Sequence, residues 1–413
     1  MTRRGLRIHI GIFGRRNSGK SSLLNAITGQ SVSIVSEIAG TTTDPVEKTM
    51  EFLPLGPVVF IDTAGIDDVG ALGKMRIAKT RRIFDRTNLA IIVSASGEWG
   101  LFEESLLKEL TELKVPSVIV FNKADQSQAN QKTLASLQGR GLKVVHTIAT
   151  EGVGVPELRQ ALLDTVPADY LNNPDMIGDL VAPGQLAVLV VPIDKEAPKG
   201  RLIVPQVQAI RNLLDNDSLC MVVKEHDLRK ALNNLKQNPA LVVTDSQAFL
   251  KVAADTPSSI LMTSFSILLA RMQGDLSELV SGAMAIDKLR PGDRILIAEA
   301  CSHHPIEEDI GRVKIPKWLN QYVGGKLEIS HVQGHDFKED ISSYKLVIHC
   351  GACMTNRREM LSRILKCKNA GVPITNYGLT IAYSLGVFER ALEAFPDVLK
   401  KYRDIKNSQS AKK

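Results

Sequence analysis

The chain has 413 residues, with 51 Lys and Arg against 45 Asp and Glu, a net charge of +6 and 44% hydrophobic residues. This length exceeds a typical single domain, so we expect two or three domains, and the hydrophobic content excludes disorder for most of the chain. The longest apolar run, Leu186 to Ile193, is far shorter than the roughly 20 residues that a membrane helix needs. We therefore expect no membrane association.

The net charge and the residues at both ends of the chain predict neither nucleic-acid binding nor export. A surplus of six charges over 413 residues is too dilute to predict nucleic-acid binding, and we interpret the basic tail 400–413 as a solvated end. The arginines near the N-terminus are not followed by an apolar stretch and a cleavage site, so we expect a cytoplasmic protein. Five cysteines form no disulfide framework, and in a reducing compartment clustered thiols favour metal binding.

The first 172 residues alternate apolar strand-length runs with helix-like segments, a pattern that predicts a mostly parallel sheet covered by helices on both faces. The expected strands are 6–13, 58–61, 89–95, 117–121 and 143–148, and the expected helices include 21–27, 73–85 and 103–113.

The segment 172–183 is rich in Asn, Pro, Gly and Asp and is interpreted as a linker. Two further α/β domains are predicted after it, 173–262 and 263–413. Their expected strands are 186–193, 219–223, 241–244, 294–300, 327–331 and 345–349. Their expected helices are 206–215, 227–236, 246–254 with Ser246 as N-cap, 264–272, 276–289, 357–368 and 379–395.

A phosphate-loop pattern runs from Gly14 to Ser21, between an expected strand and an expected helix. Glycines allow successive backbone N–H groups to face a β-phosphate, and the helix N-terminus adds partial positive charge. Lys20 is predicted to bridge the β- and γ-phosphates, and Ser21 to bind Mg2+.

Three further motifs follow in a fixed order. Asp62-Thr63-Ala64-Gly65 would hold magnesium through Asp62 and offer the Gly65 N–H to the γ-phosphate. Asn122-Lys123-Ala124-Asp125 supplies a carboxylate for guanine N1–H and N2–H2, and adenine has no donor at N1. Gly40-Thr41-Thr42-Thr43-Asp44 lies between them, in a loop that could close on magnesium.

With these motifs, residues 6–165 resemble a translation-factor-class GTPase of the Era and tRNA-modification type. The fold class predicted is therefore α/β, a P-loop GTPase domain followed by two α/β domains with mostly parallel sheets. The resemblance assigns Thr42 as the magnesium-binding switch threonine and Ala149 as a contact to guanine O6. The nucleotide-binding residues expected are Gly14, Asn17, Ser18, Gly19, Lys20, Ser21, Ser22, Thr42, Asp62, Gly65, Asn122, Lys123, Asp125 and Ala149.

Two details concern the hydrolysis rate. Ile66 stands where Ras-like proteins place a water-orienting glutamine, so slow intrinsic hydrolysis is expected, and Asp68 is a candidate for that task. Asn17 resembles the asparagine that holds K+ in potassium-activated GTPases. The alternative is that Asn17 only stabilises the loop turn. Lys20, Thr42 and Gly65 complete the expected catalytic set.

A second constellation of thiols and imidazoles lies in positions 301–353. Cys301-Ser302-His303-His304 and His349-Cys350-Gly351-Ala352-Cys353 each follow an expected strand. Because ligands gather at the carboxyl ends of parallel strands, the two groups could converge. Three thiolates suit either an iron-sulfur cluster or a Cys3His zinc site, and spacing leaves the choice open. Cys220 and Cys367 are interpreted as core residues.

The pattern Cys-x-His followed by His-Cys-x-x-Cys, joined to a potassium-type GTPase, resembles the FeFe-hydrogenase maturation GTPase family over the whole chain. Segments 311–316 and 375–378 also resemble that family. The resemblance implies a 4Fe-4S cluster on Cys301, Cys350 and Cys353, with His303 or His349 as exchangeable or nearby fourth group.

The same resemblance implies a homodimeric scaffold that receives a diiron precursor from the radical-SAM maturases HydE and HydG and delivers it to the hydrogenase HydA, with GTP, Mg2+, K+ and the cluster as cofactors. One alternative is an RNA-associated GTPase with a structural zinc module. Another is a zinc hydrolase that uses His303, His304 and Glu307 or Glu308; no helical His-Glu-x-x-His motif supports it.

Overall fold

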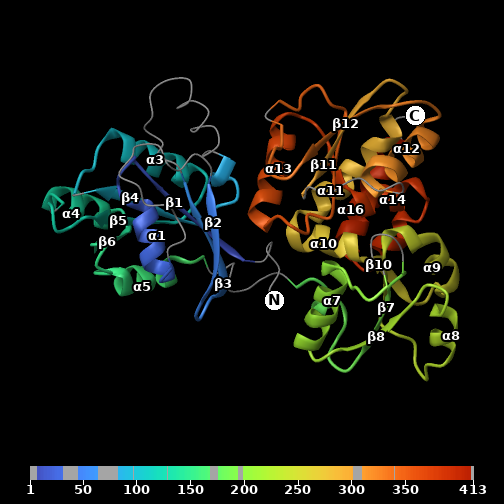
Figure 1. The fold of residues 1–413 in the computed structure, drawn as a ribbon. Helices are drawn as coiled ribbons and strands as arrows, with labels where there is room; N and C mark the ends of the chain where they lie inside the picture. The colour runs from blue at the N-terminus through green and yellow to red at the C-terminus, as the bar shows by residue number, and fades with distance from the viewer. Residues whose placement is uncertain are drawn as a thin grey trace. The chain divides into compact units, whose positions relative to one another are not determined.

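The computed structural model of the chain describes residues 7–30, 45–63, 82–95, 97–127, 129–167, 175–193, 199–300, 309–338 and 340–410. The chain divides into two compact units, Met1–Asn173 and Pro174–Lys413 (Figure 1). Among the described residues no helix has the length and hydrophobicity needed to cross a membrane.

The first unit contains a six-stranded sheet in the order β2-β3-β1-β4-β5-β6. All neighbours are parallel except the β2 and β3 pair, which confirms the mostly parallel prediction. The elements are β1 Ile8–Gly14, α1 Lys20–Thr28, β2 Val46–Phe52, β3 Gly56–Asp62, β4 Leu89–Ala95, α3 Leu101–Glu112, β5 Ser117–Asn122, α4 Gln131–Gly139, β6 Lys143–Thr147 and α5 Val155–Thr165.

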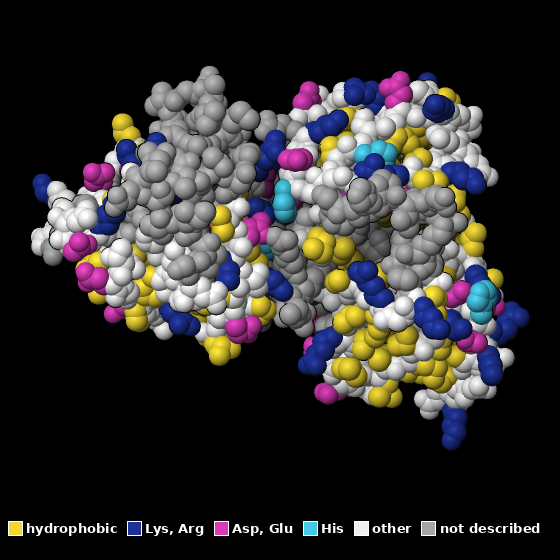
Figure 2. All heavy atoms as spheres, in the orientation of Figure 1, with side chains coloured by type: hydrophobic (Ala, Val, Ile, Leu, Met, Phe, Trp, Pro, Cys, Tyr) yellow, Lys and Arg dark blue, Asp and Glu magenta, His cyan; other side chains and the backbone are white. Residues whose placement is uncertain are grey.

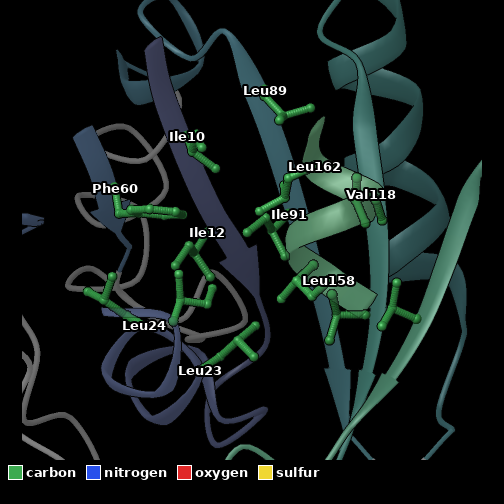
Figure 3. Close-up of a cluster of buried hydrophobic side chains, with 14 of the residues drawn as sticks. Ile10, Ile12, Leu23, Leu24, Phe60, Leu89, Ile91, Val118, Leu158 and Leu162 are labelled. Atoms are coloured by element: carbon green, nitrogen blue, oxygen red, sulfur yellow. The ribbon is translucent and has the colours of Figure 1, made fainter. Parts of the chain in front are cut away.

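Apolar side chains cover both faces of this sheet. Alternate β1 residues such as Ile10 and Ile12 pack with α1 and α5 on one face, where Leu23 and Leu158 are fully buried (Figure 3). Phe13 and the α3 and α4 leucines form the core of the other face. Burial on both faces explains why β1, β4 and β5 are nearly continuous apolar runs, and why sequence analysis located them closely.

The second unit contains two four-stranded parallel sheets, in the orders β10-β9-β7-β8 and β12-β11-β13-β14. The elements up to β10 are η2 Gly178–Leu180, β7 Leu186–Val190, α7 Val204–Asp215, β8 Leu219–Val223, α8 Leu228–Asn233, β9 Leu241–Thr244, η3 Ser246–Ala248, α9 Phe249–Asp255 and β10 Leu261–Ser264.

The remaining elements build the last sheet and its cover. They are α10 Phe265–Gln273, α11 Leu276–Ala283, η4 Met284–Lys288, β11 Arg294–Glu299, η5 Ile310–Lys314, α12 Ile315–Val323, β12 Glu328–Gln333, β13 Leu346–His349, α13 Arg357–Asn369, β14 Ile374–Asn376, α14 Tyr377–Ser384, α15 Phe388–Leu392 and α16 Pro396–Ser410. The strand order reverses between β11 and β13, so a cleft at their carboxyl ends is the expected ligand position of such a sheet.

Several predicted boundaries differ from the structure. Ser246 is not an N-cap, because a 3-10 turn begins there after Asp245, and Asp245 makes no side-chain capping bond. The expected helix 379–395 is two helices, since Gly386 adopts a left-handed backbone (φ 73°) between them. The expected helix 73–85 lies mostly outside the described residues.

Candidate functional site

The phosphate loop joins the end of β1 to the first residue of α1, as the motif predicted. Gly19 has a left-handed backbone (φ 89°), and a Cβ there would lie 2.1 Å from Asn122 Nδ2. A Cβ on Gly14 would lie 2.2 Å from the Val93 carbonyl oxygen. Both glycines are required because the loop backbone packs directly against β4 and β5.

The side chains expected to bind phosphate and magnesium meet at this loop. Lys20 is buried, and its Nζ donates to the carbonyl oxygens of Gly14 (3.0 Å) and Arg15 (2.6 Å). Ser21 Oγ donates to Asp62 Oδ2 at 2.6 Å. A hydroxyl beside a buried carboxylate fits a hard divalent cation such as Mg2+. Ser18 Oγ is buried without a hydrogen-bond partner in the described chain, and a phosphate oxygen would satisfy it.

Arg15 and Glu103 form an ion pair that sequence analysis did not identify. Arg15 Nε and Nη2 donate to the two Glu103 carboxylate oxygens at 2.6 and 3.1 Å, and the guanidinium lies over the Phe102 ring. Glu103 is fully buried and also accepts from the Gly100 N–H at 3.0 Å. The pair connects the phosphate loop to the start of α3. A Glu three residues after Gly100 was the local signal of a helix start.

The loops predicted to bind guanine are connected by Asn122. Its Nδ2 donates to the Ser18 carbonyl oxygen at 3.1 Å, and its Oδ1 accepts from Thr147 Oγ1 (3.0 Å) and the Ala149 N–H (3.1 Å). Asp125 is exposed at the same edge of the sheet. Lys123 adopts a left-handed backbone, φ 58°, which turns the chain after β5.

The remaining residues of the predicted nucleotide site divide into two groups. Asn17 is exposed with a left-handed backbone, φ 60°, and Ser22 is half-buried in α1. Thr42, Gly65 and Asp68 lie outside the described residues.

The two thiol-bearing segments follow adjacent strands of the last sheet. Ala298 of β11 is in register with His349 of β13, and the Cys350 N–H donates to the Ala298 carbonyl oxygen at 2.9 Å. The Ala300 N–H donates to Cys350 Sγ at 3.0 Å. The chain reaches position 301 one peptide unit later. Cys301 and His303 themselves lie outside the described residues.

Cys350 and Cys353 are both half-buried and are separated by Gly351 and Ala352. Ala352 adopts a left-handed backbone, φ 55°. In the described part of the chain no group of three Cys, His, Asp or Glu side chains is placed to hold a metal ion, so the cluster assignment depends on Cys301. The two described thiols fit an iron-sulfur cluster in donor chemistry, because thiolate is its preferred ligand. An N–H donor to Cys350 Sγ is also a common feature around such clusters.

A polar network lies beside these thiols. Glu299 is buried at the end of β11, where it accepts from Gln333 Nε2 (3.0 Å), Arg312 Nη2 (3.3 Å) and the Tyr377 hydroxyl (3.4 Å). Burial, with the nearby Cys350 and Glu299 charges, raises the pKa of Tyr377 well above its ordinary value. Tyr377 is therefore neutral at pH 7. No local sequence pattern predicts this network, because its members come from four separate elements.

His349 is fully buried, and both of its ring nitrogens have partners. Nδ1 lies 2.8 Å from the Cys350 carbonyl oxygen, and Nε2 lies 2.7 Å from Arg363 Nη1. Burial, followed by the Arg363 charge, lowers the pKa of His349 to about 3. Cys367 is also fully buried, and burial raises the pKa of its thiol to about 12, consistent with a core residue. Cys220 is half-buried in β8.

Comparison with known families decides the classification. The model of the hydrogen maturase F dimerization domain matches residues 176–274, and that of the hydrogen maturase F tetramerization domain matches 277–394. Together they cover more than half of the chain. The chain belongs to the hydrogen maturase F family. The model of a 50S ribosome-binding GTPase matches residues 9–123, so the first unit of this maturase F family member is a P-loop GTPase domain.

Curated GTPases are similar to part of this family member. The tRNA modification GTPase MnmE of Heliobacterium modesticaldum is 34% identical over 192 residues, which are 45% of this chain and 39% of the relative. GTPase Der of Kosmotoga olearia is 33% identical over 186 residues, 40% of this chain and 42% of the relative. The chain thus spans about two fifths of these relatives. A solved structure of Aquifex aeolicus Era bound to GDP.AlF4- is 17% identical, covering 79% of this chain and 93% of that one, with a TM-score of 0.35.

Proposed function

We propose that this protein is a GTP-hydrolysing scaffold that binds a 4Fe-4S cluster on Cys301, Cys350 and Cys353 and carries a diiron precursor during FeFe-hydrogenase maturation. The observation that supports it is the adjacency of β11 and β13. The Ala300 N–H lies 3.0 Å from Cys350 Sγ, although 50 residues separate them in sequence. Ala300, the residue before the first thiol motif, therefore lies beside Cys350 of the second motif at the carboxyl edge of a sheet.

The chemistry of this edge favours a cluster over a closed structural zinc site. When bound, a cluster with three cysteine ligands leaves one iron able to accept an exchangeable group, which is the property a carrier needs. The protein's own part is to direct the thiolates: Cys350 is held through its N–H, its carbonyl oxygen and its sulfur. Glu299 is buried beside it and accepts from the hydroxyl of the half-buried Tyr377 at 3.4 Å.

The GTPase domain is proposed to regulate partner affinity. GTP can act on the cluster domain only if the GTP and GDP states favour different arrangements or affinities. The partners inferred are the maturases HydE and HydG and the hydrogenase HydA.

Hydrolysis of GTP is expected to be slow and accelerated by K+ bound near Asn17.

The test is anaerobic reconstitution with iron and sulfide, followed by visible absorption and electron paramagnetic resonance. Wild type should take up about four irons per chain, and Cys353→Ser should lose the cluster. Cys367→Ser is the matched control, because this thiol is buried in α13 and is not expected to bind iron. Zinc found by elemental analysis, without cluster uptake, would instead support an RNA-associated GTPase with a zinc module.

A homodimer is proposed through the domain 173–262, with the cluster in 263–413. Apolar side chains gather over α7 and the edge strand β8 (Figure 2). They include Val207, Leu214, Leu219 and Val222, each between 44% and 56% exposed. An exposed edge strand with apolar side chains favours pairing with a second chain.

Light scattering after size-exclusion chromatography tests this interface. Leu219→Asp should convert the dimer to a monomer. Leu101→Asp is the control, because Leu101 is 92% exposed but belongs to the GTPase unit. A dimer that survives Leu219→Asp combined with Val222→Asp would place the interface elsewhere.

A further inference from the structure

The hydrogen bonds of His349 specify its proton. A guanidinium has donors and no acceptor, so the Nε2 atom 2.7 Å from Arg363 Nη1 must accept. The ring is neutral and carries its hydrogen on Nδ1, which donates to the Cys350 carbonyl oxygen at 2.8 Å. In this arrangement one ring nitrogen has its lone pair in a hydrogen bond, and the other holds the proton. Neither is available to iron.

Arg363 is itself held rigidly. Its Nη2 donates to Glu359 Oε1 at 2.6 Å and to the Gly334 carbonyl oxygen at 2.7 Å, and its guanidinium lies 5.3 Å from the centre of the Phe337 ring. The side chains of Arg363 and Glu359 are 3% and 7% exposed. Loss of either partner would leave an uncompensated buried charge, so these contacts hold the Arg363 guanidinium beside His349.

The Glu359 carboxylate also contacts His335, and this contact extends the network to the surface. His335 Nδ1 lies 3.0 and 3.1 Å from the two oxygens of Glu359. The Glu359 N–H donates to Asn356 Oδ1, the N-cap of α13, so the carboxylate is placed by the first turn of that helix. The start of α13, four residues after Cys353, is thereby connected through Arg363 to the backbone of Cys350.

We propose that Arg363 is a positioning residue of the cluster site, which acts through His349 to fix the Cys350 carbonyl and thiolate. In this proposal His349 supports the loop that carries Cys350 and is not an iron ligand. This inference rests on the cluster binding proposed above. It deepens that proposal by assigning the HCxxC histidine a role and by adding Arg363 and Glu359 to the site. If the imidazole bound iron, Arg363 would lose an acceptor in a place that water does not reach.

The variants for the test are Arg363→Met, Arg363→Lys and His349→Gln, with Lys366→Met as the matched control on the exposed side of α13. The melting temperature of each apo-variant is first compared with that of wild type to verify that the variant folds. A separate sample of each folded variant is then reconstituted with iron and sulfide. The readouts are the g-values of the reduced cluster, its midpoint potential, and the hyperfine coupling to 15N-labelled histidine by pulsed electron paramagnetic resonance.

We expect Arg363→Met and His349→Gln to shift the g-values and the midpoint potential in the same direction, and Arg363→Lys to restore part of the shift because it returns a charged donor. Lys366→Met should equal wild type. Any histidine coupling seen in wild type should persist in His349→Gln. Loss of that coupling in His349→Gln, or a wild-type spectrum and potential in Arg363→Met, would overturn the inference.

If the protein binds no cluster on these cysteines, the result differs from a failure of the Arg363 proposal. Wild type would then take up no cluster, or Cys350→Ser would keep a cluster with an unchanged spectrum. If Arg363→Met does not fold, the comparison of Arg363→Lys and His349→Gln decides, because an unchanged spectrum in both would reject the role of Arg363.

Discussion

The side-chain amide of Asn122 donates to the carbonyl oxygen of Ser18, 104 residues earlier in the chain. The same amide accepts from the Ala149 N–H, so one side chain connects the phosphate loop with both loops expected to hold guanine. Asn122 is 2% exposed, and water cannot replace these bonds.

We therefore expect Asn122→Ala to weaken both nucleotide binding and folding. Loss of the buried hydrogen-bond partners should lower the free energy of unfolding by about 2 kcal/mol. A loss of similar size in the free energy of binding would weaken GDP affinity more than tenfold. Titration with fluorescent GDP and urea unfolding measure the two effects. Asn130→Ala is the control: Asn130 caps α4 from an exposed position, so its loss should lower stability by about 1 kcal/mol and leave GDP affinity unchanged.

Asp125 is expected to select the base. Its carboxylate would accept from N1–H and N2–H2 of guanine, and inosine lacks the 2-amino group. Wild type should bind GTP more tightly than ITP by roughly tenfold or more, since a hydrogen bond to a charged group contributes about 1.5–3 kcal/mol. Asp125→Ala should lose this preference without loss of stability, because the residue is exposed. Equal affinity of wild type for both nucleotides would contradict the assignment.

The two interpretations of Asn17 can be separated by choosing the substitution. Its backbone is left-handed, φ 60°, so Asn17→Ala removes the amide and adds about 1–2 kcal/mol of strain, whereas Asn17→Gly removes the amide without strain. If Asn17 holds K+, hydrolysis in KCl should exceed that in NaCl for wild type and fall to the sodium rate in both variants. A turn-stabilising role predicts that Asn17→Gly keeps the potassium effect. Phosphate release at equal ionic strength measures this.

A tyrosine pair in the last unit predicts a pH dependence of stability. Tyr322 and Tyr383 donate to the two oxygens of Asp287 at 2.7 and 2.8 Å. Burial, then Asp287, raises the pKa of Tyr322 to about 12. The folded state favours the neutral phenol, so this contribution is complete below pH 10 and is lost as pH rises from about 10 through 12. Urea unfolding across that range should show a smaller loss in Tyr322→Phe. An identical slope in the variant would reject the assignment.

The parts predicted well from sequence depend on contiguous residues. The phosphate loop needs its glycines, Lys20 and Ser21 within eight positions, because a short backbone segment makes the phosphate contacts. Strands β4, β5 and β13 were located closely because strands buried on both faces are continuous apolar runs. The edge strand β2 was missed, since its polar, half-exposed residues carry no such signal.

Individual side-chain pairs that strand order brings together were not predicted from the sequence. Arg363 lies in the basic stretch of α13, which resembles a solvated helix face until β13 places His349 against it. Arg15 and Glu103 are 88 positions apart and meet because β1 and β4 are neighbours. Local composition determines which elements form, whereas buried ion pairs and the tautomer of a histidine depend on which elements become adjacent. That adjacency is decided by the tertiary structure alone.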